Sequence, residues 1–175
     1  MEDWDTWQSN KSTRWVLNKL ELSIKLGYHC GPAMKPVDIT GNYIIRPIMN
    51  LSGMGIHTRK MFLEQNRVTT IEPGYFWCEY FEGPQYSIDY KWNGKEYKPI
   101  FSSQGFIDKD EFVHFNHWKR IKFPNVDLPD WINELSLQRL VGQSCIDFKY
   151  CCVPDLESKR LTYSLADNLN QISRI

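Results

Sequence analysis

YIIRPIMNLSGMG, residues Tyr43–Gly55, is the stretch that decides the fold. Its first three residues are strong β-formers with the continuous apolar character of a buried strand. Pro47 has no N–H to donate to a neighbouring strand, so regular pairing is expected to weaken there. Gly53 and Gly55 let backbone N–H groups turn toward an anion held close above them. Taken alone, the stretch fits either an ordinary turn or a phosphate-holding loop to which Arg46 adds a positive charge.

A helix is predicted before this stretch. Apolar residues recur at helical spacing over residues 12–26, STRWVLNKLELSIKL. Ser12 or Thr13 is a suitable N-cap, and Gly27 stands where a left-handed residue would end the helix. The turn-rich segment that follows leads the chain into the strand that begins at Tyr43.

The chain after the glycine-rich stretch is predicted to be mostly antiparallel sheet up to residue 101. Residues 56–66 fit a short helix and an outgoing strand equally well. The aromatic run YFWCEYFEG predicts a strand, and Asn93-Gly94 predicts a hairpin that pairs QYSIDYKW with KEYKPIF. Three later elements are predicted in the same way: a helix over 130–142, a strand over 144–153 and a last strand over 160–165.

Composition argues against several classes of protein. The 175 residues include 21 basic and 21 acidic side chains, whereas a general nucleic-acid binder would show a basic excess or a basic block. Apolar runs stay shorter than the roughly 18 residues of a membrane-spanning helix, and the acidic N-terminus is wrong for a secretory signal. Five cysteines without paired C-x-x-C spacing indicate reduced thiols in a cytoplasmic protein.

A pair of histidines leaves its interpretation open. His114 and His117 have the i,i+3 spacing of metal ligands on one helix face. Their segment, FVHFNHWKR, offers no acidic partner at ligand spacing, and its aromatic residues favour packing. A basic, phosphate-facing patch that includes Lys119 and Arg120 is the other alternative.

Three stretches, in this order, resemble those of the ATP-grasp superfamily, and the chain is most similar to compact ATP-grasp-type proteins of bacteriophages. NKLELSIKLGYHCGPAMKP, at 18–36, is similar to the family's lysine-bearing helix and its proline-containing entry into the small lobe. YIIRPIMNLSGMG has Arg46 where the family usually has a lysine before proline. FWCEYFEGPQYSIDY, at 76–90, is similar to the hinge strand. The resemblance therefore covers residues from about 18 to 90 and is poor after them.

The fold implied by this resemblance is α+β, with a reduced ATP-grasp arrangement of antiparallel sheets flanked by helices. Residues 1–175 would form a single ATP-grasp-like unit. Within it, 43–81 would be the small glycine-loop lobe and 82–175 the larger lobe, with 12–42 as helix and linker. A nucleotide would lie between the two lobes.

The resemblance also implies a nucleotide site. Adenine would be held along the hinge by Glu79, Phe81 and Glu82, and the ribose by Gln85, where an acidic residue is more usual. The triphosphate requires positive charge and backbone donors. Those implied are Lys19, Arg46, Ser52, Gly53, Met54 and Gly55.

Metal ligands are the part of the family pattern from which this sequence departs. Such chemistry needs Mg²⁺ held by carboxylates, which the family takes from two late strands. Asp147 fits the first of these strands. The last strand, RLTYSL, has no acid, and only Asp167 and Asn168 follow it. The implied metal ligands are Asp147 and Asn168, and the implied catalytic residues are Arg46 and Asp147.

The activity implied is that of an ATP-dependent carboxylate–amine or carboxylate–thiol ligase that acts through an acylphosphate. Its partners would be ATP, Mg²⁺ and an unknown carboxylate. The alternative is a catalytically degenerate phage protein that keeps the fold and interacts with a host or virion protein. In both cases the expected compartment is the cytoplasm, which is the host's if the protein is phage-encoded.

Overall fold

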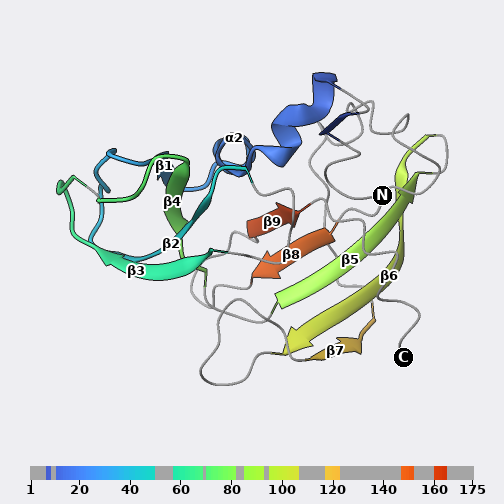
Figure 1. Cartoon of the computed structure of the whole chain (residues 1–175). Coiled ribbons are helices and arrows are strands. Elements are labelled where there is room, and N and C mark those ends of the chain that lie inside the picture. Colours follow the sequence, from blue (N-terminus) through green and yellow to red (C-terminus); the bar gives the residue numbers. More distant parts are fainter. Residues whose placement is uncertain are drawn as a thin grey trace.

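The computed structural model describes residues 7–8, 11–49, 57–68, 70–81, 85–92, 95–106, 117–122, 147–151 and 160–164. Within these ranges the chain forms short helices followed by antiparallel strands (Figure 1). The predicted α+β class is confirmed by this succession. The predicted helix over 130–142 lies outside the described residues.

The predicted N-terminal helix is divided in two at Asn18. A 3₁₀ helix, η1 (Lys11–Leu17), precedes the α-helix α2 (Lys19–Lys25). Asn18 has an extended backbone, and its side chain accepts a hydrogen bond from the N–H of Glu21 at 3.0 Å. This contact makes Asn18 the N-cap of α2, because it satisfies a donor that the first helical turn leaves free. The prediction of one continuous helix capped at Ser12 or Thr13 was wrong, whereas its predicted end at Gly27 is confirmed by that residue's φ of +73°.

Four antiparallel strands form the first sheet, in the order β1-β4-β2-β3. They are β1 (Cys30–Pro32), β2 (Gly41–Pro47), β3 (Arg59–Leu63) and β4 (Tyr75–Glu79). The strands predicted at the opening stretch and at the aromatic run are thus β2 and β4. The ambiguous segment after the glycine-rich loop is resolved as the strand β3, and β1 lies in the segment expected to be a linker.

Side chains on the two faces of this sheet pack into two separate clusters. One face carries Trp77 and Ile45, both fully buried, together with Val37, Tyr43, Leu63 and Ile71. The opposite face carries Phe76, Cys78, Cys30 and Tyr28, against which residues of the helix segment such as Leu20 and Leu26 pack. Alternation of side chains along β4 separates the two clusters, since Trp77 points one way and its two neighbours the other.

A second antiparallel sheet follows, in the order β5-β6-β7. Its strands are β5 (Gln85–Trp92), β6 (Tyr97–Phe106) and β7 (His117–Arg120). The predicted pairing of QYSIDYKW with KEYKPIF is confirmed, because β5 and β6 run antiparallel with Trp92 opposite Tyr97, and the register shifts once between Asp89 and Tyr90. The turn residues Asn93 and Gly94 lie outside the described residues. A two-stranded sheet joins β8 (Asp147–Cys151) to β9 (Arg160–Ser164), and β8 lies against β5 (Figure 1). Within the described ranges, no helix is both long and apolar enough to cross a membrane.

Candidate anion-binding site

Arg46 lies near the end of β2, on the face of the sheet that carries Phe76. The two residues are cross-strand partners, and the guanidinium carbon stands 5.2 Å from the centre of the Phe76 ring. A guanidinium over an aromatic face gains a cation–π attraction and keeps its N–H groups free to point sideways. The side chain is half-buried, so its charge is held at a fixed place at the edge of the packed cluster.

Ser23 connects Arg46 to the first turn of α2. Its Oγ accepts a hydrogen bond from Nη2 of Arg46 at 3.4 Å and donates one to the carbonyl oxygen of Lys19 at 2.7 Å. The backbone N–H of Lys19 in turn donates to the carbonyl oxygen of Ile48, two residues beyond Arg46, at 2.8 Å. Two residues expected to hold phosphate, far apart in the sequence, are therefore brought together where β2 ends and α2 begins.

The charge of Arg46 is not neutralised by any acidic side chain in the described part of the chain. Ion pairs there join His29 to Asp38, Arg59 to Glu72, Arg67 to Glu64 and Lys98 to Glu96. Nε of Arg46 is buried and, among the described residues, has no hydrogen-bond acceptor. An unsatisfied buried donor costs about 1–3 kcal/mol, and more when it is charged. An anion that accepted this N–H would remove that cost.

Two thiols lie beside the guanidinium and leave its charge uncompensated. Cys30 and Cys78 are direct partners across β1 and β4, and both are buried and free. Burial raises the pKa of Cys78 to about 12, even though the charge of Arg46 acts in the opposite direction. Burial likewise raises the pKa of Cys30. Both groups therefore stay neutral at physiological pH, so neither supplies the negative charge that Arg46 lacks.

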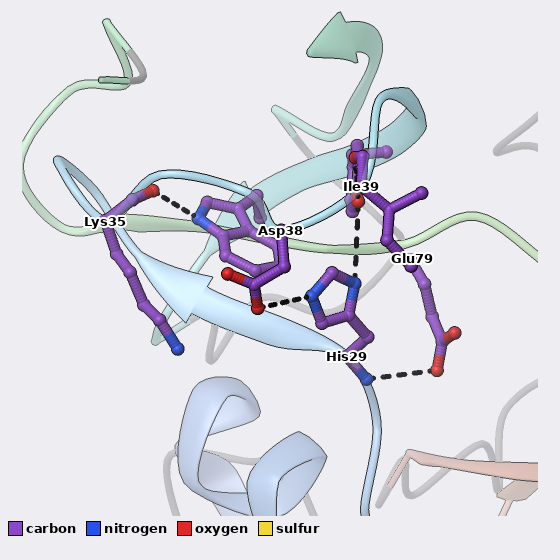
Figure 2. A network of polar contacts seen from close by, with 7 residues as sticks. His29, Lys35, Asp38, Ile39 and Glu79 are labelled. Atoms are coloured by element: carbon purple, nitrogen blue, oxygen red, sulfur yellow. Dashed lines mark hydrogen bonds and ion pairs between the residues drawn. The ribbon is translucent and has the colours of Figure 1, made fainter. Parts of the chain in front are cut away.

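The hinge residues divide between the two faces of the sheet. The ring of Phe81 packs edge-on against Tyr28 at 5.2 Å, within the cluster that borders Arg46. The carboxylate of Glu79, by contrast, accepts the backbone N–H of His29 at 3.1 Å (Figure 2). Since Glu79 follows Cys78 on β4, its side chain leaves the sheet on the face opposite Arg46. A contact between Glu79 and a ligand beside Arg46 would have to come from its backbone.

Two residues of this region were not singled out from the sequence. Lys60 on β3 pairs with Ile44, and its Nζ lies 3.9 Å from the centre of the Tyr80 ring. Cross-strand pairing through Ile44 puts Lys60 on the same face as Arg46, which adds a second positive charge there. The sequence could not place Lys60, because its segment fitted helix and strand equally. Ser23 could have been identified from the sequence, because it lies one helical turn after Lys19 and therefore on the same side of the helix.

Several expected site residues lie outside the described ranges: Ser52, Gly53, Met54, Gly55, Glu82 and Asn168. Gln85 and Asp147 are the first residues of β5 and β8, two strands that lie against each other. Among the described residues, no group of three His, Cys, Asp or Glu side chains could hold a metal ion. The assignment of Asp147 and Asn168 to Mg²⁺ therefore stays a prediction.

His117 does not occupy the helix that a metal-binding pair with His114 requires. It lies in the strand β7, where its ring stacks on that of Phe106 with a centroid distance of 4.8 Å and an angle of 3°. His114 lies outside the described residues. The packing interpretation of His117 is therefore confirmed by the stacked ring. Lys119 and Arg120 are exposed on the same strand.

No family model and no curated protein matches the sequence. Among solved structures, the chain is similar to a protein from Archaeoglobus fulgidus that is provisionally described as belonging to the ATP-grasp superfamily. The similarity has a TM-score of 0.45 and 15% sequence identity, and it covers 86% of this chain and 45% of that one. This chain thus spans less than half the length of that protein.

Proposed function

We propose that the protein binds ATP, with the phosphates held beside Arg46. The observation that carries the proposal is the half-buried guanidinium whose Nε has no acceptor and whose charge has no carboxylate partner among the described residues. Such a group is costly for the protein alone and favourable once an anion is bound. The choice of ATP among anions comes from the sequence resemblance to the ATP-grasp superfamily.

Each residue around Arg46 has a definite part in this proposal. Arg46 would donate to phosphate oxygens through its planar fork, and Ser23 and the Phe76 ring would keep the fork in place. Lys19 would add a further positive charge from the start of α2, and the 52–55 loop would supply backbone N–H donors. The buried, unpaired Nε is the feature that fits a phosphate, because that ligand offers several acceptor oxygens to one guanidinium.

The reaction that we propose is ATP-dependent ligation of a carboxylate to an amine or a thiol. ATP would supply a phosphoryl group that makes the carboxylate oxygen a leaving group. The protein's own part would be to hold phosphate charge with Arg46 and Lys19, and to hold Mg²⁺ with Asp147 and Asn168.

Thermal or chemical unfolding with and without Mg²⁺-ATP tests the binding proposal. A ligand present at 100 times its dissociation constant adds about 2.7 kcal/mol to the free energy of unfolding. Arg46→Ala should abolish this increase, and Arg46→Lys should retain part of it because the charge remains. Arg59→Ala is the matched control, because Arg59 forms an ion pair with Glu72 at 2.5 Å and lies over the Tyr75 ring on the other face of the sheet. This change should leave the increase with Mg²⁺-ATP intact.

The outcomes separate the alternatives. An unchanged unfolding free energy at millimolar Mg²⁺-ATP would contradict the proposal and favour a protein that binds only other macromolecules. Stabilisation by ATP without ADP release, in the presence of mixed carboxylates and amines, would identify a nucleotide-binding protein that has lost ligase activity. Stabilisation that persists in Arg46→Ala would place the nucleotide elsewhere.

A further inference from the structure

Cys30 and Cys78 face each other in neighbouring strands of the first sheet. They are direct partners in the register of β1 and β4, and both are free thiols. Residues opposite each other in adjacent strands project from the same side of a sheet. Both side chains accordingly belong to the buried cluster that contains Phe76. The two thiols are therefore neighbours across the strand pair.

The backbone hydrogen bonds show which kind of strand pair the two cysteines form. The N–H of Glu79 donates to the carbonyl oxygen of His29 at 2.9 Å, one position away from the cysteine pair. Hydrogen-bonded and non-hydrogen-bonded pairs alternate along an antiparallel ladder, so Cys30 and Cys78 form a non-hydrogen-bonded pair. The Cα atoms of such a pair lie about 4.5 Å apart, within the range of about 4.4–6.8 Å that a disulfide spans. A bond between the two sulfur atoms therefore requires no displacement of either strand.

Strand β1 is the part of this sheet that opens most readily to an oxidant. It has three residues, stands at the edge of the sheet and pairs with β4. A short edge strand has few contacts to lose, so it opens at a lower free energy than the central strands do. While the strand is closed, burial raises the pKa of both thiols, and the charges of Lys35 and Arg46 only partly oppose this effect at Cys30. The reactive thiolate therefore forms when β1 opens.

We propose that Cys30 and Cys78 form a reversible disulfide that fastens β1 to β4 when the protein meets hydrogen peroxide. The Cys30 thiolate attacks one peroxide oxygen and the O–O bond breaks, which leaves a sulfenic acid and a hydroxide that takes up a proton to become water. When β1 closes, the Cys78 sulfur attacks the sulfenic sulfur, the S–O bond breaks, and a second water leaves with the Cys78 proton. Two electrons pass from the two sulfurs to the peroxide. A dithiol reductant reverses the reaction.

The bond acts on the whole sheet, because the loop that it closes, residues 30–78, contains β2 and β3. A cross-link of this kind stabilises a fold by restricting the unfolded chain. It also restrains the face that carries Arg46, since Arg46 lies two residues beyond Ile44, the partner of Cys78 on β2. The inference rests on the strand register and the hydrogen-bond pattern, so it does not depend on nucleotide binding.

Peptide mapping of the oxidised full chain tests the bond. After treatment with hydrogen peroxide, the thiols of Cys30 and Cys78 should be lost, and digestion without reductant should yield two peptides joined through these residues. Cys30→Ala and Cys78→Ala should each abolish the link. Cys151→Ala is the matched control, because Cys151 lies in β8 of another sheet, and it should leave the link intact. Free thiols at both positions, sulfinic acid without a link, or a link from either cysteine to a different one would overturn the proposal.

Amide hydrogen exchange of Gly31 tests whether the bond fastens β1. In the oxidised protein the opening equilibrium at Gly31 should fall by at least about tenfold, and dithiothreitol should restore it. Cys78→Ala, given the same treatment, should show no such change. A disulfide that forms without slowing the exchange of Gly31 would contradict the fastening of β1.

The rate of oxidation tests the opening step. A Cβ at Gly31 would lie 2.7 Å from the Trp77 ring, and opening of β1 relieves this clash. Gly31→Ala should therefore form the disulfide roughly tenfold faster than the unchanged protein. Gly41→Ala is the matched control and should react at the original rate, because its Cβ would meet nothing within 4 Å. Equal rates in the two variants would show that the thiols react in the closed sheet and would overturn the opening step.

Discussion

The two faces of the first sheet differ in how completely they satisfy their polar groups. On the Trp77 face, the indole N–H donates to the carbonyl oxygen of Lys35 at 2.9 Å and the Tyr43 hydroxyl donates to Ile39 at 2.7 Å. On the Phe76 face, the Nε of Arg46 is buried without an acceptor among the described residues. Closed packing stabilises a fold, whereas an unsatisfied charge beside it is destabilising until a ligand arrives. The closed packing of the Trp77 face accounts for stability, and the Phe76 face is the one on which we propose that an anion binds.

Trp77→Ala should lower the stability most, because it removes the central side chain of the Trp77 face, the face whose polar groups are satisfied. The side chain is fully buried, and its loss also leaves the Lys35 carbonyl without its donor. We expect a loss of about 3–5 kcal/mol in the free energy of unfolding, measured by denaturant titration. Phe62→Ala is the control on the opposite face: Phe62 is 62% exposed, and its loss should stay within about 0.5 kcal/mol. Equal effects of the two changes would contradict the division between the faces.

Gly31→Ala should come next. A Cβ at this position would lie 2.7 Å from Cδ of Lys35 and 2.7 Å from the Trp77 ring. Lys35 can move aside, but the buried Trp77 ring cannot, so we expect a loss of about 1–3 kcal/mol by the same titration. Gly41→Ala is the matched change within the same sheet, because its Cβ would meet nothing within 4 Å. A Gly31→Ala variant as stable as Gly41→Ala would show that the side chains of the Trp77 face can move to make room for a methyl group.

The thiol of Cys78 makes the stability of the Phe76 face depend on pH. Its pKa of about 12 in the folded state lies above that of an unfolded cysteine, near 8.5. Stability from this group is therefore fully present below about pH 8.5 and is lost as the pH rises toward the folded value. Denaturant titrations should show a decline approaching 1.4 kcal/mol per pH unit within this window, and Cys78→Ala should reduce the slope. An unchanged slope in the variant would assign the decline to other groups.

Arg46→Met should have the smallest effect on stability and the largest on binding. Methionine keeps much of the side-chain volume over Phe76 and removes the unsatisfied donor, so the free energy of unfolding without ligand should change by less than about 1 kcal/mol. The increase with Mg²⁺-ATP should be lost. Destabilisation of several kcal/mol without nucleotide would show instead that Arg46 is a structural residue and that the two faces share the same role.

The sequence was sufficient for the parts of the fold that depend on local pattern. The apolar run at Tyr43, the aromatic run before Glu79 and the Asn93-Gly94 pair each specify a strand or a turn through residues that are neighbours in the chain. The division at Asn18 was missed, because a side chain that caps a helix also fits a helical stripe. Strand β3 was left undecided, since its identity depends on pairing with β2.

Only part of the candidate site was predicted: two of its charged residues were singled out from the sequence, but their contacts were not. Lys19 and Arg46 were singled out because they are positively charged and stand where the family pattern has phosphate ligands. Ser23 joins these two residues through a tertiary contact with Arg46, which lies 23 positions away in the sequence. No local pattern in the sequence signals such a contact. The orientation of Glu79 toward His29 was likewise invisible, because it depends on which face of β4 each residue occupies.

The length of α2 has a consequence for the cooperativity of the molecule. A helix of seven residues is too short to persist in water alone, and this one is held by the Asn18 cap, by the Ile48 carbonyl and by the contact between Ser23 and Arg46. Lys19 therefore has a fixed position only while the sheet is intact. An anion bound there would slow amide exchange in β2 and β4 as strongly as in α2, because site and sheet would open as one unit.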